Sequence, residues 1–217
     1  MFKSKSQQKV NIKYELYMAE TALQYGTYYH IYNRGTNGEV LFIHEKYYAE
    51  FLTLYKEYIV PVADTLAYCL MSNHFHLLIR VKSEHEIRTF DELKMFTKND
   101  ANHDPLKKPV PSNQFQHLFL TYTKKINTAY IRTGSLFEHP FERRIIENEN
   151  YLKECIVCIH NNPVKDGYAI SAAEYKWSSY NAIISDKPTL IKREHVLNLF
   201  GDLEKLYYFH GVFEKNV

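Results

Sequence analysis

The chain is 217 residues long, and 45% of its residues are hydrophobic and 24% charged, which is the balance of a globular protein. A formal net charge of +2 excludes a protein that is basic over its whole surface, and the length leaves little room for a second independent domain. No run approaches the roughly 18 apolar residues of a membrane-spanning helix, and the basic start has no apolar stretch behind it, so we predict neither an integral membrane protein nor a secretory signal.

Three cysteines, Cys69, Cys155 and Cys158, are too few and odd in number for a disulfide framework. A reducing compartment is therefore expected, and we predict a cytoplasmic protein. The aromatic share of 15% is unusual, because 19 tyrosines and 13 phenylalanines stand against a single tryptophan. Tyrosine can pack in a core, stack on bases, donate a hydrogen bond or act as a nucleophile, so the excess alone selects none of these roles.

The first part of the chain predicts an arm followed by a strand, a helix and a hairpin. Residues 1–24 are polar, bear lysines and show no strong periodicity, and they form the predicted arm. From residue 27 the run TYYHIYNRG is aromatic and β-rich and ends at a polar turn, which indicates a strand. Residues 44–60 place apolar side chains at spacings of three and four before Pro61, which predicts a helix. TLAYCLM and HFHLLIRV, separated by two polar residues, predict neighbouring antiparallel strands.

The middle of the chain predicts a loop and a long helix. Residues 84–113 are polar and contain three prolines, so we expect a short helix at about 84–95 and then an exposed loop. Residues 113–132 repeat apolar side chains at helical spacing and predict a second helix, with Gly134 beyond its end as a stop signal.

The last third predicts a strand and further helices. FERRIIEN indicates a fourth strand. Asn150 is the expected N-cap of a helix over residues 151–162, which Pro163 ends. Residues 193–200 predict a further amphipathic helix.

The order strand, helix, strand, strand, helix, strand is that of a split β-α-β sheet. We therefore predict an α+β protein with a ferredoxin-like antiparallel sheet, helices packed on one face, and an additional helix after the fourth strand. The core of this fold spans residues 25–170, and residues 171–217 form a helical extension packed on it. This architecture carries many unrelated activities, so the fold alone assigns no function.

Two histidines on the third predicted strand form the first candidate site. Side chains alternate along a strand, so His74 and His76 project to one side and Phe75 to the other. Imidazole binds divalent metals readily, and a third ligand from elsewhere would leave coordination positions open for a substrate. The alternative, common for this pattern in an arbitrary strand, is one histidine satisfied in the core and one facing a neighbour. Leu78 and Arg80 continue the histidine face, which is therefore mixed.

The segment CIHNNPVKDG forms the second candidate site. Cys158 and Asn162 are four residues apart and share one helical face. The amide oxygen of Asn162 could complete a site begun by the histidines, or Asn162 and Pro163 could be an ordinary helix stop. Cys155 and Cys158 form a CxxC pair, but one such pair is poor support for structural zinc, and at helical spacing both can be small core residues.

Four segments, in chain order, carry a resemblance that local patterns do not supply. They are MSNHFHLLIRV, NTAYIRTGSLFEHPFERRII, YLKECIVCIHNNPVKDGY and YKWSSYNAI, and the likeness spans residues 27–210. In these segments the chain resembles the single-tyrosine HUH transposases, in the branch called REP-associated tyrosine transposases. The resemblance implies an HUH motif on a central strand of the ferredoxin-like sheet and a following helix that carries the nucleophile position. Trp177 and Tyr180 in the last segment are expected to pack the C-terminal part onto the core.

The resemblance implies a metal-assisted attack on DNA. His74 and His76 would bind a divalent metal, Mg²⁺ or Mn²⁺, with Asn162 at the position of the family's third ligand. Such an ion polarises the scissile phosphate of single-stranded DNA and offsets charge in the transition state. A tyrosine then forms a 5′-phosphotyrosyl link and releases a 3′-hydroxyl, which can later reverse the step on another strand. Histidine ligands by themselves would suggest a transition metal, so magnesium comes from the resemblance.

This chain departs from the family at the nucleophile. The family's tyrosine stands five residues before the proline of the NP motif, and here that position is Cys158. A thiol, with an ordinary pKa of about 8.5 and a shorter reach, is a poor replacement for a phenol in attack on a phosphodiester. Three interpretations remain open. Cleavage has been lost and DNA binding kept, or another tyrosine substitutes, or Cys158 itself or a metal-bound water acts.

Tyr151 is the nearest substitute on the same helix. It stands seven residues before Cys158, and so on a similar face but two turns or about 10 Å away along the axis. Its alternative role is to pack against the sheet in the first turn of the helix.

Basic and aromatic residues provide candidates for DNA contact, although a solvated surface charge is the commoner role for each basic residue alone. Phosphate contacts combined with base-stacking aromatic side chains are the usual means of binding single strands. The basic candidates are Arg34, Lys124, Lys125, Arg132, Arg143, Arg144 and Lys165. The aromatic candidates are Tyr122, Tyr130, Phe137 and Phe141. The resemblance implies single-stranded or hairpin DNA as the ligand.

Two functions follow from these patterns. The first is a transposase-like protein that binds single-stranded or hairpin DNA and a divalent metal, with strand cleavage impaired or altered at Cys158. The alternative is a catalytically silent, DNA-binding or regulatory protein derived from a transposase, and the two differ in a covalent protein–DNA adduct. A third hypothesis is a metal-dependent enzyme that acts on small molecules through the two histidines. We expect no membrane partner, and a monomer, because the chain carries one complete set of strands, helices and ligands.

Overall fold

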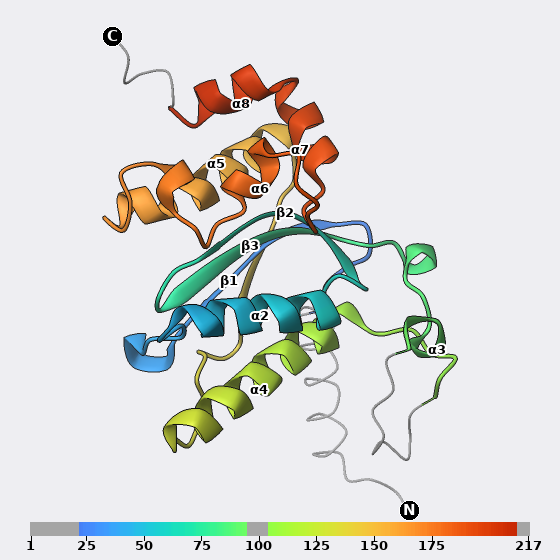
Figure 1. Cartoon of the computed structure of the whole chain (residues 1–217). Coiled ribbons are helices and arrows are strands. Elements are labelled where there is room, and N and C mark those ends of the chain that lie inside the picture. Colours follow the sequence, from blue (N-terminus) through green and yellow to red (C-terminus); the bar gives the residue numbers. More distant parts are fainter. Residues whose placement is uncertain (1–21, 95–103, 212–217) are drawn as a thin grey trace, which may run out of the picture.

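The computed structural model describes residues 22–94 and 104–211 (Figure 1). The predicted arm therefore lies almost entirely outside the described residues, and so does part of the loop predicted over residues 84–113. One sheet contains β1 (Tyr28–Arg34), β2 (Ala63–Leu70), β3 (His74–Val81) and β4 (Glu142–Ile145). The helices are α2 (Glu45–Tyr58), α3 (Phe90–Leu93), α4 (Pro111–Tyr130), α5 (Glu149–Lys165), α6 (Tyr180–Ile184), α7 (Arg193–Phe200) and α8 (Leu203–Phe209), with 3₁₀ turns η1 (Thr36–Gly38), η2 (Glu84–Glu86) and η3 (Ala172–Glu174).

The sheet has the strand order β2-β3-β1-β4, and every neighbouring pair is antiparallel. The predicted α+β fold with a ferredoxin-like antiparallel sheet is confirmed, and β3, which carries the two histidines, is a central strand. Figure 1 shows α2 and α4 on one face of the sheet and α5 with α6, α7 and α8 on the other. In the described residues no helix is both long and apolar enough to cross a membrane.

The two faces of the sheet bury two separate hydrophobic cores, and β3 contributes to both. Phe75, Leu77 and Ile79 pack into the core shared with α2 and α4, whereas Leu78 packs into the core shared with α5. His74 and His76 alternate with Phe75 and so lie on the α5 face. The strand therefore uses one set of side chains to hold the sheet on α2 and α4 and the other set to face α5.

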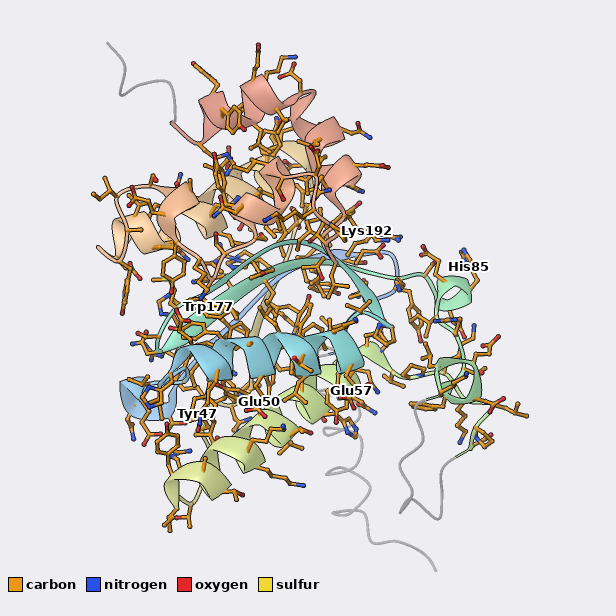
Figure 2. The ribbon with its side chains drawn as sticks, in the orientation of Figure 1. Tyr47, Glu50, Glu57, His85, Trp177 and Lys192 are labelled. Atoms are coloured by element: carbon orange, nitrogen blue, oxygen red, sulfur yellow. The ribbon has the colours of Figure 1, made fainter. Side chains whose placement is uncertain are left out.

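Trp177 and Tyr180 both pack, as expected. Trp177 lies near α2 (Figure 2), where its ring stacks on that of Tyr48 with centroids 4.6 Å apart. Tyr180 is buried in the core on the α5 face. These contacts join the segment after α5 to both helix layers.

The helix predicted over residues 84–95 is two short elements. Ser83 and Thr89 each begin a new turn with a capping box, in which the Glu three residues later bonds back to the cap. A second cap inside the predicted helix interrupts it, because a capping residue has an extended backbone. The long helix α4 begins at Pro111, two residues earlier than predicted, since proline fits the first helical position, where its missing N–H is not needed.

Both ends of α5 differ from the prediction. The N-cap is Asn148, whose Oδ1 accepts a hydrogen bond from the Tyr151 N–H at 2.9 Å, and not Asn150. Pro163 does not end the helix but lies inside its last turn. A proline there forgoes only one hydrogen bond. The helix instead ends before Gly167, whose φ of +76° suits a residue without Cβ.

The two asparagines near the start of α5 give a first testable prediction. Replacing Asn148 with alanine removes the side-chain acceptor at the N-cap and is expected to lower the free energy of unfolding by about 1 kcal/mol, as measured by urea denaturation. Asn150→Ala is the matched control and is expected to change stability by less than about 0.5 kcal/mol. Equal losses from the two variants would contradict the assignment of the cap.

A buried hydrogen-bonded chain fastens the last helices to α5. His160 Nδ1 lies 2.9 Å from His210 Nε2, and His160 Nε2 lies 2.8 Å from Ser179 Oγ. Ser179 Oγ in turn accepts a hydrogen bond from the Tyr68 N–H of β2 at 2.8 Å. Burial lowers the pKa of both histidines, most strongly that of His160, so both imidazoles are neutral at pH 7.

Candidate functional site

The centre of the site is the pair His74 and His76 on β3. Their ring centroids are 5.3 Å apart and the ring planes are inclined by 82°. Both side chains are half-buried on the face of the sheet that meets α5. The strand thus presents two imidazoles side by side, as its alternation predicts.

In each imidazole one ring nitrogen lies within hydrogen-bond distance of a neighbouring side chain. His74 Nδ1 lies 2.9 Å from Asn73 Oδ1, and His76 Nδ1 lies 2.9 Å from His30 Nε2 on β1. With the Asn73 oxygen as acceptor, Nδ1 of His74 carries the proton and Nε2 bears a lone pair. Histidines that bind metals commonly have this arrangement, in which a second hydrogen bond fixes the tautomer.

Burial keeps these imidazoles neutral. It lowers the pKa of His76 to about 3, helped by the neighbouring His30 and His74, and it lowers the pKa of His30 to about 4, helped by Arg144. The pKa of His74 is also lowered by burial, although the Asp166 carboxylate opposes this shift. At neutral pH the three rings therefore offer lone pairs and no positive charge.

The last turn of α5, which the sequence did not predict, brings a carboxylate to the histidines. Asp166 Oδ2 lies 3.7 Å from His74 Nε2. With neutral His74 in the tautomer described above, two lone-pair donors face each other across this gap. Ligands bound at about 2.1 Å to one ion lie about 3 to 4 Å from each other, so the gap has the width that a shared cation requires.

The predicted third ligand, Asn162, lies one turn before Asp166 on α5, and the Asp166 N–H donates to its carbonyl oxygen at 2.9 Å. Its side chain is half-buried and has no hydrogen-bond partner within the described residues. Across residues 22–94 and 104–211, no three His, Cys, Asp or Glu side chains are gathered closely enough to hold an ion alone. A metal at the histidines would thus need an amide, water or substrate oxygen as well.

A cavity of about 730 Å³ opens beside the histidines at the ends of β1, β3 and β4. Its walls carry polar groups of both signs, with an ion pair between Arg34 Nε and Glu138 Oε2 at 2.8 Å. The lining side chains that matter here are His74, His76, Tyr32, Glu142, Arg34 and Glu138. An open cavity beside neutral imidazoles, lined by one arginine and two glutamates, can admit an extended ligand.

The candidate nucleophiles on α5 lie in different surroundings. Cys158 is exposed, with Lys165 Nζ 3.9 Å from its Sγ, whereas Cys155 is buried and its pKa is raised to about 12 by burial. The Tyr151 hydroxyl accepts a hydrogen bond from Arg144 Nη1 at 3.2 Å, and this bond raises the pKa of Arg144. The described residues that line the cavity include none of these three candidates.

The predicted DNA-contacting residues fall on two sides of the sheet. Arg34 lines the cavity, Arg144 meets α5 through Tyr151, and Lys165 lies at the end of α5. Arg143 alternates with Arg144 and lies over the ring of Phe141, 4.6 Å from its centroid.

The other three predicted contacts belong to the α2 and α4 side. Lys124 and Lys125 lie on α4, where Lys125 pairs with Glu50 of α2, and Arg132 pairs with Glu39. The structure therefore does not bring the seven basic residues into one surface.

The prediction of base stacking is wrong for three of the four aromatic residues. Tyr122, Phe137 and Phe141 are buried in the core under α2 and α4, and their rings pack against one another or against other core aromatics. Tyr122 lies on α4, and Phe137 and Phe141 lie in the segment before β4; in all three residues the large apolar ring is buried in the core. Of the four, only Tyr130 is exposed, and it lies at the end of α4.

Sequence reasoning missed His30, Tyr32, Asp166 and Glu142. A signal existed for the first two, because the alternation used for His74 and His76 also places His30 and Tyr32 on one face of TYYHIYNRG. Asp166 was missed because the helix was ended at Pro163. Glu142 has no local signal, since its position depends on the register between β1 and β4.

Comparisons with known proteins show a likeness of fold. No family model and no curated protein matches the sequence. A solved structure of a REP-associated tyrosine transposase bound to a REP hairpin superimposes with a TM-score of 0.52 and 12% identity, over 77% of this chain and 85% of that one.

Two bacterial tRNA(His) guanylyltransferase-like proteins match less well. The complex with GTP gives a TM-score of 0.36 at 10% identity, over 73% of this chain and 76% of that one. The complex with ATP gives 0.35 at 10% identity, over 82% of this chain and 79% of that one. The chain thus shares its fold with a REP-associated tyrosine transposase.

Proposed function

We propose that this chain is a transposase-like protein that binds single-stranded or hairpin DNA in the cavity beside His74 and His76. The observation that carries the proposal is the pair of neutral imidazoles, each held through Nδ1, on a central strand at the wall of an open cavity. The fold shared with a transposase whose structure contains a hairpin supports it. Arg34, Arg144 and Lys165 are the proposed phosphate contacts.

A divalent metal, Mg²⁺ or Mn²⁺, fits the residues that are present. His74 and His76 would hold it, and the amide of Asn162 and the Asp166 carboxylate offer the oxygen ligands that such ions prefer. When bound, the ion would polarise a phosphate that enters the cavity. Because the protein supplies few ligands, coordination positions would remain for phosphate oxygens.

The metal proposal gives a second testable prediction, which concerns Asn73. Asn73→Ala removes the partner that fixes the tautomer of His74 and is expected to weaken Mn²⁺ binding by about 10- to 100-fold, as measured by titration calorimetry. Asn198→Ala, on the exposed side of α7, is the control and should bind Mn²⁺ as the native protein does. Equal affinities of the native protein and the Asn73 variant would contradict a metal at His74.

DNA binding is tested by fluorescence anisotropy with labelled single-stranded, hairpin and duplex oligonucleotides over a series of salt concentrations. We expect tighter binding of the first two, with an affinity that falls as salt rises in proportion to the number of phosphates contacted. Binding that prefers duplex DNA, or that does not depend on salt, would overturn the proposal.

The two sides of the sheet provide matched variants. An Arg34→Ala and Arg144→Ala double variant is expected to weaken binding by about 10-fold or more, whereas a Lys124→Ala and Lys125→Ala double variant is expected to change it little. The opposite result would place the DNA on α2 and α4.

A catalytically silent DNA-binding or regulatory protein is the second candidate. It is favoured by the exposed Cys158 at the position where the resembled family has its tyrosine. The two candidates differ in one product. A protein that cleaves DNA by covalent attack retains labelled DNA on a denaturing gel, and a binder does not, unless Cys158→Tyr restores the attack.

A further inference from the structure

One row of side chains crosses three strands next to the histidines. The register pairs Tyr32 of β1 with His76 of β3 on one side and with Glu142 of β4 on the other. Side chains of directly paired residues lie on the same face of an antiparallel sheet, with Cβ atoms about 5 Å apart. Glu142, Tyr32 and His76 therefore stand in a line on the α5 face, and all three line the cavity.

Tyr32 is well placed within this row. Its ring centroid lies 5.8 Å from that of His76 and 5.0 Å from that of His30, and the side chain is half-buried. No other tyrosine is among the described residues that line the cavity. Arg144 pairs with His30 across β1 and β4, so it is a diagonal neighbour of Tyr32 on the same face, a position from which a guanidinium can offset negative charge at the phenol oxygen.

The carboxylate of Glu142 needs an explanation in a cavity that binds DNA. A negative charge beside phosphates is repelled, so a purely binding surface would favour a neutral or basic residue there. A carboxylate on the residue that pairs with a tyrosine on the neighbouring strand is placed to accept the phenol proton, which is a catalytic use that offsets the cost.

We infer that Tyr32 is the nucleophile that attacks the scissile phosphodiester and that Glu142 accepts its proton. This inference rests on the proposed function and names the residues that would carry it out. The phenol oxygen forms a bond to phosphorus, the bond from phosphorus to the 3′-oxygen breaks, and the phenol proton passes to Glu142. The 3′-oxygen leaves with a proton from water, and the product is a 5′-phosphotyrosyl link at Tyr32.

The test incubates the full chain with labelled, hairpin-bearing single-stranded DNA and Mn²⁺ and resolves covalent adducts on a denaturing gel. We expect the native protein to form an adduct and mass spectrometry of its peptides to locate the DNA on Tyr32. Tyr32→Phe keeps the ring and is expected to abolish the adduct. Glu142→Gln is expected to slow its formation by about 100-fold or more, while the affinity for the same DNA changes by less than about threefold.

Tyr208→Phe, in an exposed tyrosine of α8, is the matched control and should form the adduct at the native rate. An adduct that survives Tyr32→Phe, or one that maps to Cys158 or Tyr151, would overturn the inference. So would a native protein that binds the DNA without forming an adduct. Failure to bind the DNA at all, by anisotropy without metal, would instead overturn the proposed function.

Discussion

Replacing Phe75 with alanine is expected to lower the free energy of unfolding by about 3–5 kcal/mol. Phe75 stands between His74 and His76 in the sequence. Its side chain is fully buried and points to the face of the sheet opposite to theirs. Its ring packs against those of Phe51, Phe119 and Phe137, with centroids 5.4, 5.6 and 6.0 Å apart. Truncation would leave a cavity among rings from α2 and α4 and the segment before β4, which cannot all close it. Urea denaturation, followed by circular dichroism, measures the loss.

Leu120→Ala is the control, because Leu120 lies on α4 but is 55% exposed, and its removal should cost less than about 0.5 kcal/mol. A loss below about 1 kcal/mol for Phe75→Ala would mean that the core under β3 is loosely packed. In that case the strand could not hold the two histidines in a fixed arrangement, and the site would need another means of support.

Acid is expected to destabilise the protein through its buried histidines. The pKa of His160 and that of His210 are lowered by burial, so the unfolded chain binds these protons at a higher pH than the folded one. Their contribution to stability is complete above about pH 6.5, the unfolded pKa, and is lost as the pH falls toward the lowered folded values. Each such histidine steepens the loss of stability with falling pH by up to about 1.4 kcal/mol per pH unit.

The measurement is the free energy of unfolding in urea at several pH values. His160→Gln is expected to lower stability at pH 7, because it disturbs the chain to Ser179 and His210, yet to flatten the acid limb by up to about 1.4 kcal/mol per pH unit. His85→Gln, in an exposed residue of η2, should give a curve parallel to the native one. An acid limb with the same slope in all three proteins would show that other groups govern the acid response.

Much of the fold could be predicted from local patterns, because its core elements follow simple periods. The alternation in HFHLLIRV gives both faces of β3, and the spacing of apolar residues gives α2 and α4. The order of these elements then leaves few topologies, and the ferredoxin-like one is observed. The second helix layer was harder to anticipate, since α6 and α8 are short and carry little periodicity.

The candidate site was only partly predictable, because it depends on chain ends and strand register. The proline rule ended the helix at Pro163, but in a last turn the cost is one hydrogen bond, and the turn that follows carries Asp166 to His74. Aromatic composition suggested base stacking at Tyr122, where packing in the core is the stronger force. Glu142 meets Tyr32 only through pairing between segments more than a hundred residues apart.

The short strand β4 also affects how the molecule behaves at high concentration. It is an edge of the sheet, and an open edge offers unpaired backbone groups to any other strand that approaches. Glu142, Arg143 and Arg144 fill three of its four positions, and short, charged edge strands are a known protection against edge-to-edge aggregation. The charges of β4 would therefore oppose edge-to-edge association of copies of the chain at high concentration.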